Sequence, residues 1–475
     1  MTGVPAACAL ALALLAGACT PWTPAPAGPA ANPETLHGAS RRDREGWTFV
    51  HLEGTPERMG FQHGYLLADE IDGVVASMRA TVRYETERDW QFFRATAQRI
   101  FWPRVPDDLR AEIRGLVAGL RARGKRLDEW DLVAENAYLE IAWYYVPSLK
   151  RGAPVPRPPV RRVPPGSCSA FVATGSWTRG GKVVMGHNNW VGYWLGRAWT
   201  VLFDLAPARG HHFVMDGLPG LVHSGDDFYI SDAGLMITET TIAEANQFDR
   251  LGVPEFVRAR RAIQLADSIE AWVETMSRDS NGAYANDWLI GDRKSGDIAQ
   301  LSNGLHNQRT VRLHDGFFVG ANFGADPKLV AEETNYRARP DSSMEARRRR
   351  WMDLMRENKG DIDVEAAKHF LADHFDVVTQ TERPSSRTLC GHGDLDPDPR
   401  PEWHEAAFQP TGAVTSKATD SDLAAQLALW VAAGHACGLR FDAAAFLRAH
   451  PEFGWQKTVL RDLPGAPWAL VSGLR

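Results

Sequence analysis

Residues 166–188 read Gly-Ser-Cys-Ser-Ala-Phe-Val-Ala-Thr-Gly-Ser-Trp-Thr-Arg-Gly-Gly-Lys-Val-Val-Met-Gly-His-Asn. Residues 169–174 and 182–188 have the character of short strands, and the glycine pair between them is typical of a turn. The preceding residues, 152–167, are rich in proline and contain three arginines, which favours an exposed, extended loop. We therefore predict that a sheet begins at Cys168, directly after a loop that is accessible to proteolysis.

The chain before this loop has a helical pattern. Between residues 55 and 145 apolar side chains recur at helical spacing, as at Leu66, Ile71 and Val74. Thr55, followed by Pro and Glu, is typical of a capped helix start. The sequence predicts an α-rich N-terminal segment over residues 55–151.

The chain after the first two strands mixes both element types. Strands are expected at 199–205 and 235–241, hairpins at 287–301 and 311–320, and helices at 254–277 and from residue 342 onward. Strands followed by helices and then by further hairpins indicate α+β layering rather than a doubly wound parallel sheet.

The first residues have the composition of an export signal. Residues 4–18 are mainly Ala, Leu and Gly, a run too short to cross a bilayer but similar to the apolar part of a secretory signal. We predict a signal peptide over residues 1–18 and a Pro/Ala-rich tether and lead-in over residues 19–54. Cys19 is a candidate for a lipid anchor, because the residues before it approximate a bacterial lipobox. The expected location is the bacterial periplasm, the envelope or the medium.

The overall composition is that of an ordinary globular protein, with 44% hydrophobic and 24% charged residues. Lys and Arg number 53 against 59 Asp and Glu, which gives a formal net charge of −6. Because the chain has no general basic field, we expect no nucleic-acid partner and no attraction to anionic membranes.

Three cysteines follow the leader: Cys168, Cys390 and Cys437. An odd number cannot pair completely, so either all three are free or Cys390 and Cys437 form one bridge. In both cases Cys168 can remain a thiol.

No local motif supports metal or serine chemistry. His211-His212 has no further ligand at metal spacing, and His404-Glu405 lacks the second histidine of a zinc-protease helix. No Gly-x-Ser-x-Gly stretch occurs anywhere in the sequence. The sequence therefore predicts no metal site and no cofactor.

The position of Cys168 indicates a chemistry. Cleavage of the bond between Ser167 and Cys168 would give Cys168 an α-amine, whose pKa of about 7.7–8.0 lets it act as the base for its own thiol. The thiol can also attack the preceding carbonyl, so one nucleophile would serve both maturation and turnover. The alternative is a small buried core cysteine without a catalytic role.

Three further side chains are candidates for the same site. A hairpin of this length would bring His187 near the start of the partner strand, although a histidine satisfied at a strand end is the alternative. Trp190 follows closely and is either a core residue or a cleft wall. Asn286 opens a later strand with an amide that could stabilise an oxyanion, or could simply cap the strand.

Taken together, these residues resemble a known family. The similarity runs through Met59-Gly-Phe-Gln-His63-Gly64, Cys168-Ser-Ala, His187-Asn-Asn-Trp190, Glu239-Thr-Thr241, Tyr284-Ala-Asn286-Asp-Trp288 and Gly320-Ala-Asn322. The sequence resembles the phospholipase B-like proteins and, more distantly, the isopenicillin N acyltransferase-like peptidases, both within the N-terminal nucleophile (Ntn) hydrolase superfamily. The resemblance implies an αββα four-layer sandwich with an α-rich N-terminal pro-segment and an Ntn core over residues 168–475.

The resemblance also implies roles for individual residues. Cys168 would be the nucleophile, His187 and Trp190 its neighbours in the cleft, Asn286 the oxyanion donor and Thr241 a supporting hydroxyl. Self-cleavage before Cys168 would give a smaller and a larger chain that stay associated. The family's arginine is not placed by the sequence, with Arg309, Arg387 and the run from Arg347 to Arg350 as candidates.

The implied function is an exported hydrolase that cleaves a fatty-acyl ester or amide, such as a phospholipid, through an acyl-thioester on Cys168. Two alternatives stay open. An acyltransferase would pass the acyl group to an amine, and an exported binding protein would use the same cleft without turnover.

Overall fold

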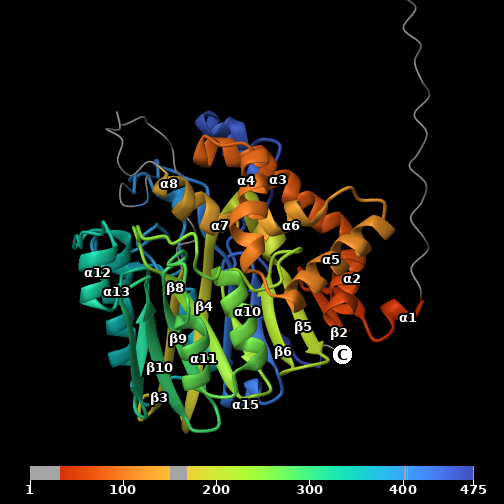
Figure 1. The fold of residues 1–475 in the computed structure, drawn as a ribbon. Helices are drawn as coiled ribbons and strands as arrows, with labels where there is room; N and C mark the ends of the chain where they lie inside the picture. Colours follow the sequence, from red (N-terminus) through yellow and green to blue (C-terminus); the bar gives the residue numbers. More distant parts are fainter. Residues whose placement is uncertain (1–32, 150–167, 401–402, 404, 474–475) are drawn as a thin grey trace, which may run out of the picture.

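The computed structural model describes residues 33–149, 168–400, 403 and 405–473 (Figure 1). The predicted signal peptide, the candidate lipid anchor Cys19, the Pro/Arg-rich loop of residues 152–167 and its last residue, Ser167, lie outside the described residues.

Two sheets form the centre of the molecule. The larger has nine strands, in the order β1 (Ser40–Arg44), β2 (Trp47–Gly54), β5 (Val201–Pro207), β6 (Phe213–Gly217), β7 (Tyr229–Ser231), β8 (Leu235–Thr241), β9 (Asn286–Asp292), β10 (Asp297–Asn303) and β11 (Gln308–Leu313). Its strands pair antiparallel except for β2 and β5, which are parallel.

The smaller sheet has six strands, all antiparallel. Their order is β12 (Gly316–Gly320), β3 (Ser169–Gly175), β4 (Gly181–Gly192), β15 (Thr411–Asp420), β16 (Leu429–Ala433) and β17 (Ala469–Val471). Strands β3 and β4 form the predicted hairpin around Gly180-Gly181 and lie in the interior of the sheet.

The two sheets pack face to face. Val172, Val183 and Met185 of the smaller sheet share a buried cluster with Leu202 and Leu289 of the larger one. Successive side chains of a strand point to opposite faces of its sheet. One set therefore packs against the facing sheet, and the other set is available to pack against an outer layer of helices.

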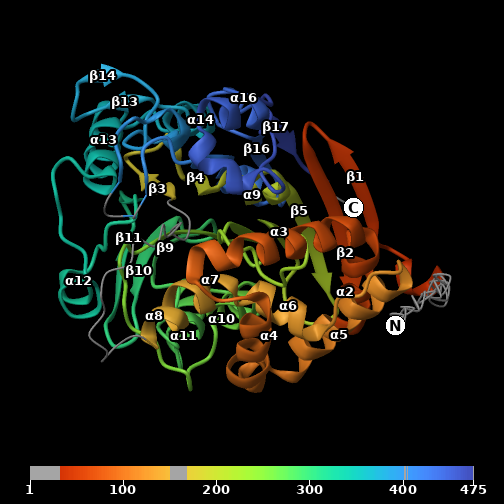
Figure 2. The ribbon, with the colours of Figure 1, turned by 90° about the horizontal axis from the view of Figure 1, so that it is seen from above.

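Helices cover the outer face of each sheet, as Figure 2 shows from above. The helices α2 (Pro56–Leu66), α3 (Ala68–Thr86), α5 (Asp107–Ala122), α6 (Glu129–Asn136), α10 (Glu255–Leu265) and α11 (Ile269–Ser277) share one core with the larger sheet. The helices α13 (Ser343–Glu357) and α14 (Val364–Leu371) share another with the smaller sheet. The predicted αββα four-layer sandwich is therefore confirmed.

Shorter elements complete the described chain. They are α1 (Pro33–Leu36), α4 (Trp90–Thr96), α7 (Tyr138–Glu140), α8 (Val146–Ser148), α9 (Tyr193–Gly196), α12 (Pro327–Glu333), α15 (Ser421–Ala424), α16 (Ala443–Ala449) and a ribbon of β13 (Phe375–Asp376) with β14 (Thr381–Glu382). Within the described ranges, no helix has both the length and the apolar character needed to span a bilayer.

The predicted helical segment is held together by an unusually close helix pair. Thr55 caps α2 by accepting a hydrogen bond from the Arg58 backbone at 3.4 Å. Gly60 of α2 faces α5, and a Cβ atom at Gly60 would lie 1.9 Å from the Glu112 carbonyl oxygen. Gly64, Gly115 and Gly119 make similar backbone approaches, so these glycines allow α2 and α5 to pack closely.

The lead-in predicted for residues 19–54 is not separate from the folded core. Its last part forms β1 and β2, and β2 extends the larger sheet by pairing with β5. Trp47, Val50 and Leu52 are buried, with side chains on both faces of the sheet. The partner strand is about 150 residues away in the chain, so no local pattern could have indicated this pairing.

The hairpin predicted for residues 311–320 is wrong. Strand β11 pairs with β10 in the larger sheet, whereas β12 pairs with β3 in the smaller one. The turn between them carries the chain from one sheet to the other. Asp315 in this turn accepts hydrogen bonds from the Ser176 backbone at 2.7 Å and from the Ser176 hydroxyl at 2.9 Å, which fixes the turn to the end of β3.

Candidate active site

Cys168 lies directly before β3, with 1% of its surface exposed. Ala170 and Val172 of the same strand point between the sheets, and alternation places Cys168 on that side as well. Its thiol is free, as are those of Cys390 and Cys437, so the predicted alternative of a bridge is not what the structure holds. Burial raises the pKa of the Cys168 thiol well above its usual value. The thiol is therefore protonated in the uncut chain, and its proton must be transferred when the sulfur acts as a nucleophile.

Arg347 of α13 holds the backbone of Cys168. Its guanidinium donates to the Cys168 carbonyl oxygen at 2.7 Å, to the Ser169 hydroxyl at 3.1 Å and to the Asn322 side-chain oxygen at 3.0 Å. It also lies 4.4 Å from the centre of the Trp190 ring. Of the arginines that the sequence left open, Arg347 is the one that contacts Cys168.

The other two alternatives lie elsewhere. Arg387 forms ion pairs with Asp376 and Asp398. Arg309 lies on β11 at the edge of the larger sheet, with an exposed side chain. Sequence alone could not separate these arginines, because the choice depends on how α13 packs over the start of β3.

Asn286 and Thr241 lie opposite each other at the ends of β9 and β8. Asn322 connects this pair to Arg347, because its amide donates to the Thr241 carbonyl oxygen at 2.9 Å. Asn286 is fully buried, and neither of its amide atoms has a hydrogen-bond partner among the described residues. The alternative role of capping its strand therefore finds no support, whereas an unpaired buried amide is a suitable oxyanion donor.

His187 lies opposite Ala170 in β3 and opposite Lys417 in β15. Its ring is 6.3 Å from that of Phe228, and neither ring nitrogen has a hydrogen-bond partner in the described part of the chain. Burial and the Lys417 ammonium hold the pKa of His187 well below its usual value. His187 is thus a neutral neighbour of the site, and no hydrogen bond joins it to the Cys168 thiol.

Trp190 lies beside Cys168. Its backbone N–H faces the Cys168 sulfur, and its ring packs between Arg347 and Gly391. A Cβ atom at Gly391 would lie 2.0 Å from this ring, so glycine is required there. Trp190 is both a buried residue and a part of the site, which combines the two interpretations that the sequence allowed.

Asn189 is a further residue that the sequence reasoning did not single out. The pairing of Ser169 with Asn188 places Asn189 next to Cys168 across the hairpin. Its side chain is buried, and both amide atoms lack hydrogen-bond partners in the described residues. The two consecutive asparagines after His187 are visible in the sequence, but no neighbouring residue indicates which of the two amides lies at the site.

A buried charge cluster lies beside His187. The Lys417 ammonium donates to Asp216 at 2.7 Å and to Asp226 at 2.5 Å, and the Lys417 side chain has no exposed surface. The Ser224 hydroxyl lies within hydrogen-bond distance of both carboxyl groups, at 3.1 Å from Asp216 and 2.7 Å from Asp226. The buried triad of Lys417, Asp216 and Asp226 connects β15 of the smaller sheet with β6 and the loop before β7. It therefore fixes the two sheets relative to each other near the site.

Removing the Lys417 ammonium tests this role. We expect Lys417→Met to lower the free energy of unfolding by about 3–5 kcal/mol, because two buried carboxylates lose the cation between them. Urea unfolding in a Cys168→Ala background measures the change on a single uncut chain.

Lys182→Met is the matched control on the same sheet, since its ammonium pairs with Asp422 at the surface. We expect a far smaller effect there, because exposed ion pairs contribute little. Equal losses for the two variants would contradict a stabilising role for the buried triad.

The site is closed to solvent in the continuous chain. Cys168, His187, Trp190, Thr241 and Asn286 each have at most 1% of their surface exposed. A cavity of about 680 Å³ lies elsewhere, between β1, α3 and α9, and none of these five residues lines it. A substrate can therefore reach the Cys168 thiol only if the residues that bury it move.

Comparison with known proteins identifies the family of this chain. The sequence profile of the Phospholipase B family matches residues 67–315, just over half of the chain. The chain belongs to the phospholipase B family. The match includes Cys168, His187, Trp190, Thr241 and Asn286, and the family resemblance expected from the sequence is confirmed.

Individual relatives have low sequence identity to this chain. A protein of Archaeoglobus fulgidus described as uncharacterized is 27% identical over 257 residues, which are 52% of this chain and 41% of the relative. Phospholipase B-like 2 of Mus musculus is 31% identical over 146 residues, which are 27% of this chain and 24% of that protein. The matched region thus covers less than half of the length of these relatives. Among solved structures, a conjugated bile acid hydrolase from Clostridium perfringens aligns with a TM-score of 0.33 and 8% identity, over 56% of this chain and 89% of that one.

Proposed function

We propose that this phospholipase B family member is a self-processing Ntn hydrolase that cleaves an acyl ester or amide through an acyl-thioester on Cys168. One observation carries the proposal. Cys168 lies at the start of a central strand, and Arg347 donates to its carbonyl oxygen. Arg347 also donates to Asn322, whose amide donates to the Thr241 carbonyl oxygen. Thr241 lies opposite Asn286, whose side-chain amide is unpaired in the described chain.

Maturation would begin with attack of the Cys168 sulfur on the carbonyl carbon of Ser167. The peptide C–N bond breaks as the C–S bond forms, and the nitrogen takes the thiol proton to become the α-amine of Cys168. Water then hydrolyses this ester-like intermediate, leaving a carboxylate on Ser167 and a free thiol on Cys168. The new amine, with an unperturbed pKa of about 7.7–8.0, is the base that the buried thiol lacks before cleavage.

Turnover would use the same groups. The α-amine takes the thiol proton, the thiolate attacks the acyl carbonyl, and the leaving alcohol or amine receives a proton as the thioester forms. The Asn286 amide and the Trp190 backbone N–H are the donors that would stabilise the tetrahedral oxyanion. Water then releases the carboxylic acid and restores the thiol.

The fold supports continued association of the two chains after cleavage. The segment before the cut supplies β1 and β2 to the larger sheet. Its helices α2, α3, α5 and α6 share a core with β5, β8 and β9. Separation would expose this core to water, which is strongly unfavourable. We also propose export of the precursor, which the composition of residues 1–18 supports.

A thiol-directed acylating probe tests the proposed nucleophile. We expect one acyl group on the peptide that begins at Cys168, and labelling that is competed by an acyl ester substrate. Tryptic mapping by mass spectrometry locates the adduct. Labelling of Cys390 or Cys437 with Cys168 unmodified, in protein that hydrolyses the substrate, would overturn the assignment.

A further inference from the structure

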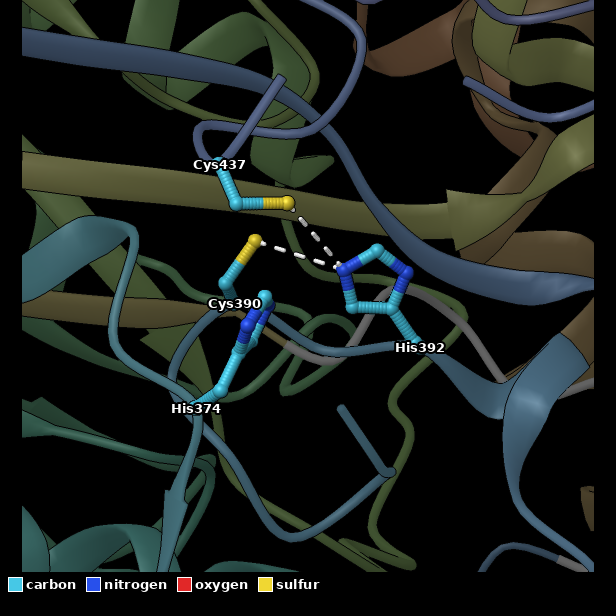
Figure 3. Close-up of side chains that lie close together, drawn as sticks. All are labelled: His374, Cys390, His392 and Cys437. Atoms are coloured by element: carbon cyan, nitrogen blue, oxygen red, sulfur yellow. Dashed lines mark hydrogen bonds between the residues drawn. The ribbon is translucent and has the colours of Figure 1, made fainter. Parts of the chain in front are cut away.

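Four potential metal ligands converge behind the smaller sheet: His374, Cys390, His392 and Cys437 (Figure 3). One ligand atom from each lies within 4.8 Å of all the others. They come from three separate segments, namely the turn after α14, the loop before Gly393–Leu395 and the loop after β16. No part of this cluster belongs to the hydrolytic site.

The spacing of these atoms fits a tetrahedral ion. The Cys390 and Cys437 sulfurs lie 3.6 Å and 3.5 Å from Nε2 of His392. A tetrahedral Zn²⁺, with bonds of about 2.3 Å to sulfur and about 2.0–2.1 Å to nitrogen, holds such ligand atoms about 3.6 Å apart. Two cysteines and two histidines are also a donor set that zinc prefers.

The surroundings of the cluster suit ligands rather than a packed core. Cys390 and His392 are buried, and both cysteines are free thiols. Nε2 of His374 is buried without a hydrogen-bond partner in the described chain. The backbone N–H groups of Ala436 and Cys437 face the Cys390 sulfur.

A carboxylate lies next to the cluster. Asp394 is 3.9 Å from Nδ1 of His392, the ring nitrogen that does not face the sulfurs. Histidine ligands of zinc commonly have a carboxylate or carbonyl near their second nitrogen, which orients the ring.

A second group of potential ligands in the molecule provides a contrast. His51, Asp204 and His212 also lie close together. There, however, Asp204 is already hydrogen-bonded to both imidazoles, at 2.7 Å from Nδ1 of His51 and closely to His212. These contacts account for the arrangement without a metal, so no ion is inferred at that position.

We propose that His374, Cys390, His392 and Cys437 bind one structural Zn²⁺ ion. Four protein ligands complete the tetrahedral shell and leave no position for substrate, which distinguishes a structural from a catalytic zinc. Binding displaces the two thiol protons, so the ion is held by two thiolates and two neutral imidazoles.

The ion would brace one wall of the hydrolytic site. Gly391 lies between two of its ligands and packs against the Trp190 ring. The neighbouring Leu389 carbonyl accepts a hydrogen bond from Asn188 at 2.9 Å, and the Gly391 carbonyl accepts one from the Ala413 backbone at 3.0 Å. The metal therefore ties the C-terminal loop to the backbone that supports Trp190.

Metal analysis of untagged protein, purified without chelators, tests this proposal. We expect about one zinc per chain by plasma mass spectrometry, and loss of at least nine tenths of it in Cys390→Ser and in Cys437→Ser. Asp204→Asn and Cys168→Ala are the matched controls, because they alter the other ligand group and the nucleophile, and they should retain the metal.

Cobalt provides a readout that does not depend on variant folding. Exchange of the native protein with Co²⁺ should give the intense visible absorption of a tetrahedral site together with a thiolate charge-transfer band. Protein without bound zinc or cobalt would overturn the proposal, as would a Cys390–Cys437 disulfide in freshly purified material. Metal retained at full stoichiometry by folded Cys390→Ser and Cys437→Ser would also overturn it.

Discussion

Replacing Cys168 by alanine is expected to lower kcat/KM on acyl ester substrates by about 10⁴-fold or more, because it removes the atom that forms the acyl intermediate. The substitution deletes one buried sulfur at the start of β3 and leaves the contact of Arg347 with the residue 168 carbonyl intact. Hydrolysis of a chromogenic ester by the purified variant measures the effect, and thermal unfolding checks that the fold persists.

Cys168→Ser separates the nucleophile from the shape of the site. A hydroxyl at this position has similar size and connectivity but is a weaker nucleophile. We expect slower processing and residual turnover well below that of the parent protein. If Cys168→Ala instead hydrolysed the ester at the parental rate, the reaction would have to use another residue.

Replacing Asn286 by alanine is expected to lower kcat by about 10²–10³-fold, the usual effect of removing one oxyanion donor. Its side-chain amide is buried and has no hydrogen-bond partner in the described chain, so the substitution removes no side-chain hydrogen bond that holds the fold together. KM should change much less than kcat, since the donor acts on charge that develops in the transition state. Steady-state kinetics on fully processed protein separates the two constants.

Asn303→Ala is the matched control for this variant. Asn303 pairs with Asn286 in the neighbouring strand, but its amide donates to the Met276 carbonyl at 3.0 Å, away from the nucleophile. We expect a modest loss of stability and nearly parental kcat. A similar fall in kcat for both variants would indicate general damage to the sheet rather than loss of a specific donor.

Much of the fold follows from local sequence. The β3–β4 hairpin depends on Gly180 and Gly181, both of which adopt positive φ angles that glycine favours. Strand β8 and the β9–β10 hairpin also lie where alternation and turn residues predict them. Cys168 is a candidate nucleophile for the same reason, since it stands at the boundary between a proline-rich stretch and a strand.

The remaining features depend on contacts between distant parts of the chain. The pairing of β2 with β5 and the crossing of the chain between β11 and β12 are set by the assembled sheets. Arg347 reaches Cys168 because α13 packs over β3, and its sequence context is a run of four arginines that resembles a solvated helix face.

The four proposed metal ligands show the same limit. Only one residue separates Cys390 from His392, but His374 and Cys437 come from other loops, so the sequence has no compact ligand motif. The prediction of no metal site rested on such motifs. Only the packing of three loops brings the four side chains together.

Intact-mass measurement with N-terminal sequencing of the purified protein tests whether the chain cleaves itself before Cys168. We expect two associated fragments, the larger beginning at Cys168, and a single uncut chain for Cys168→Ala. An uncut parent chain that still hydrolyses acyl substrates would contradict this expectation, as would the same cut in both proteins.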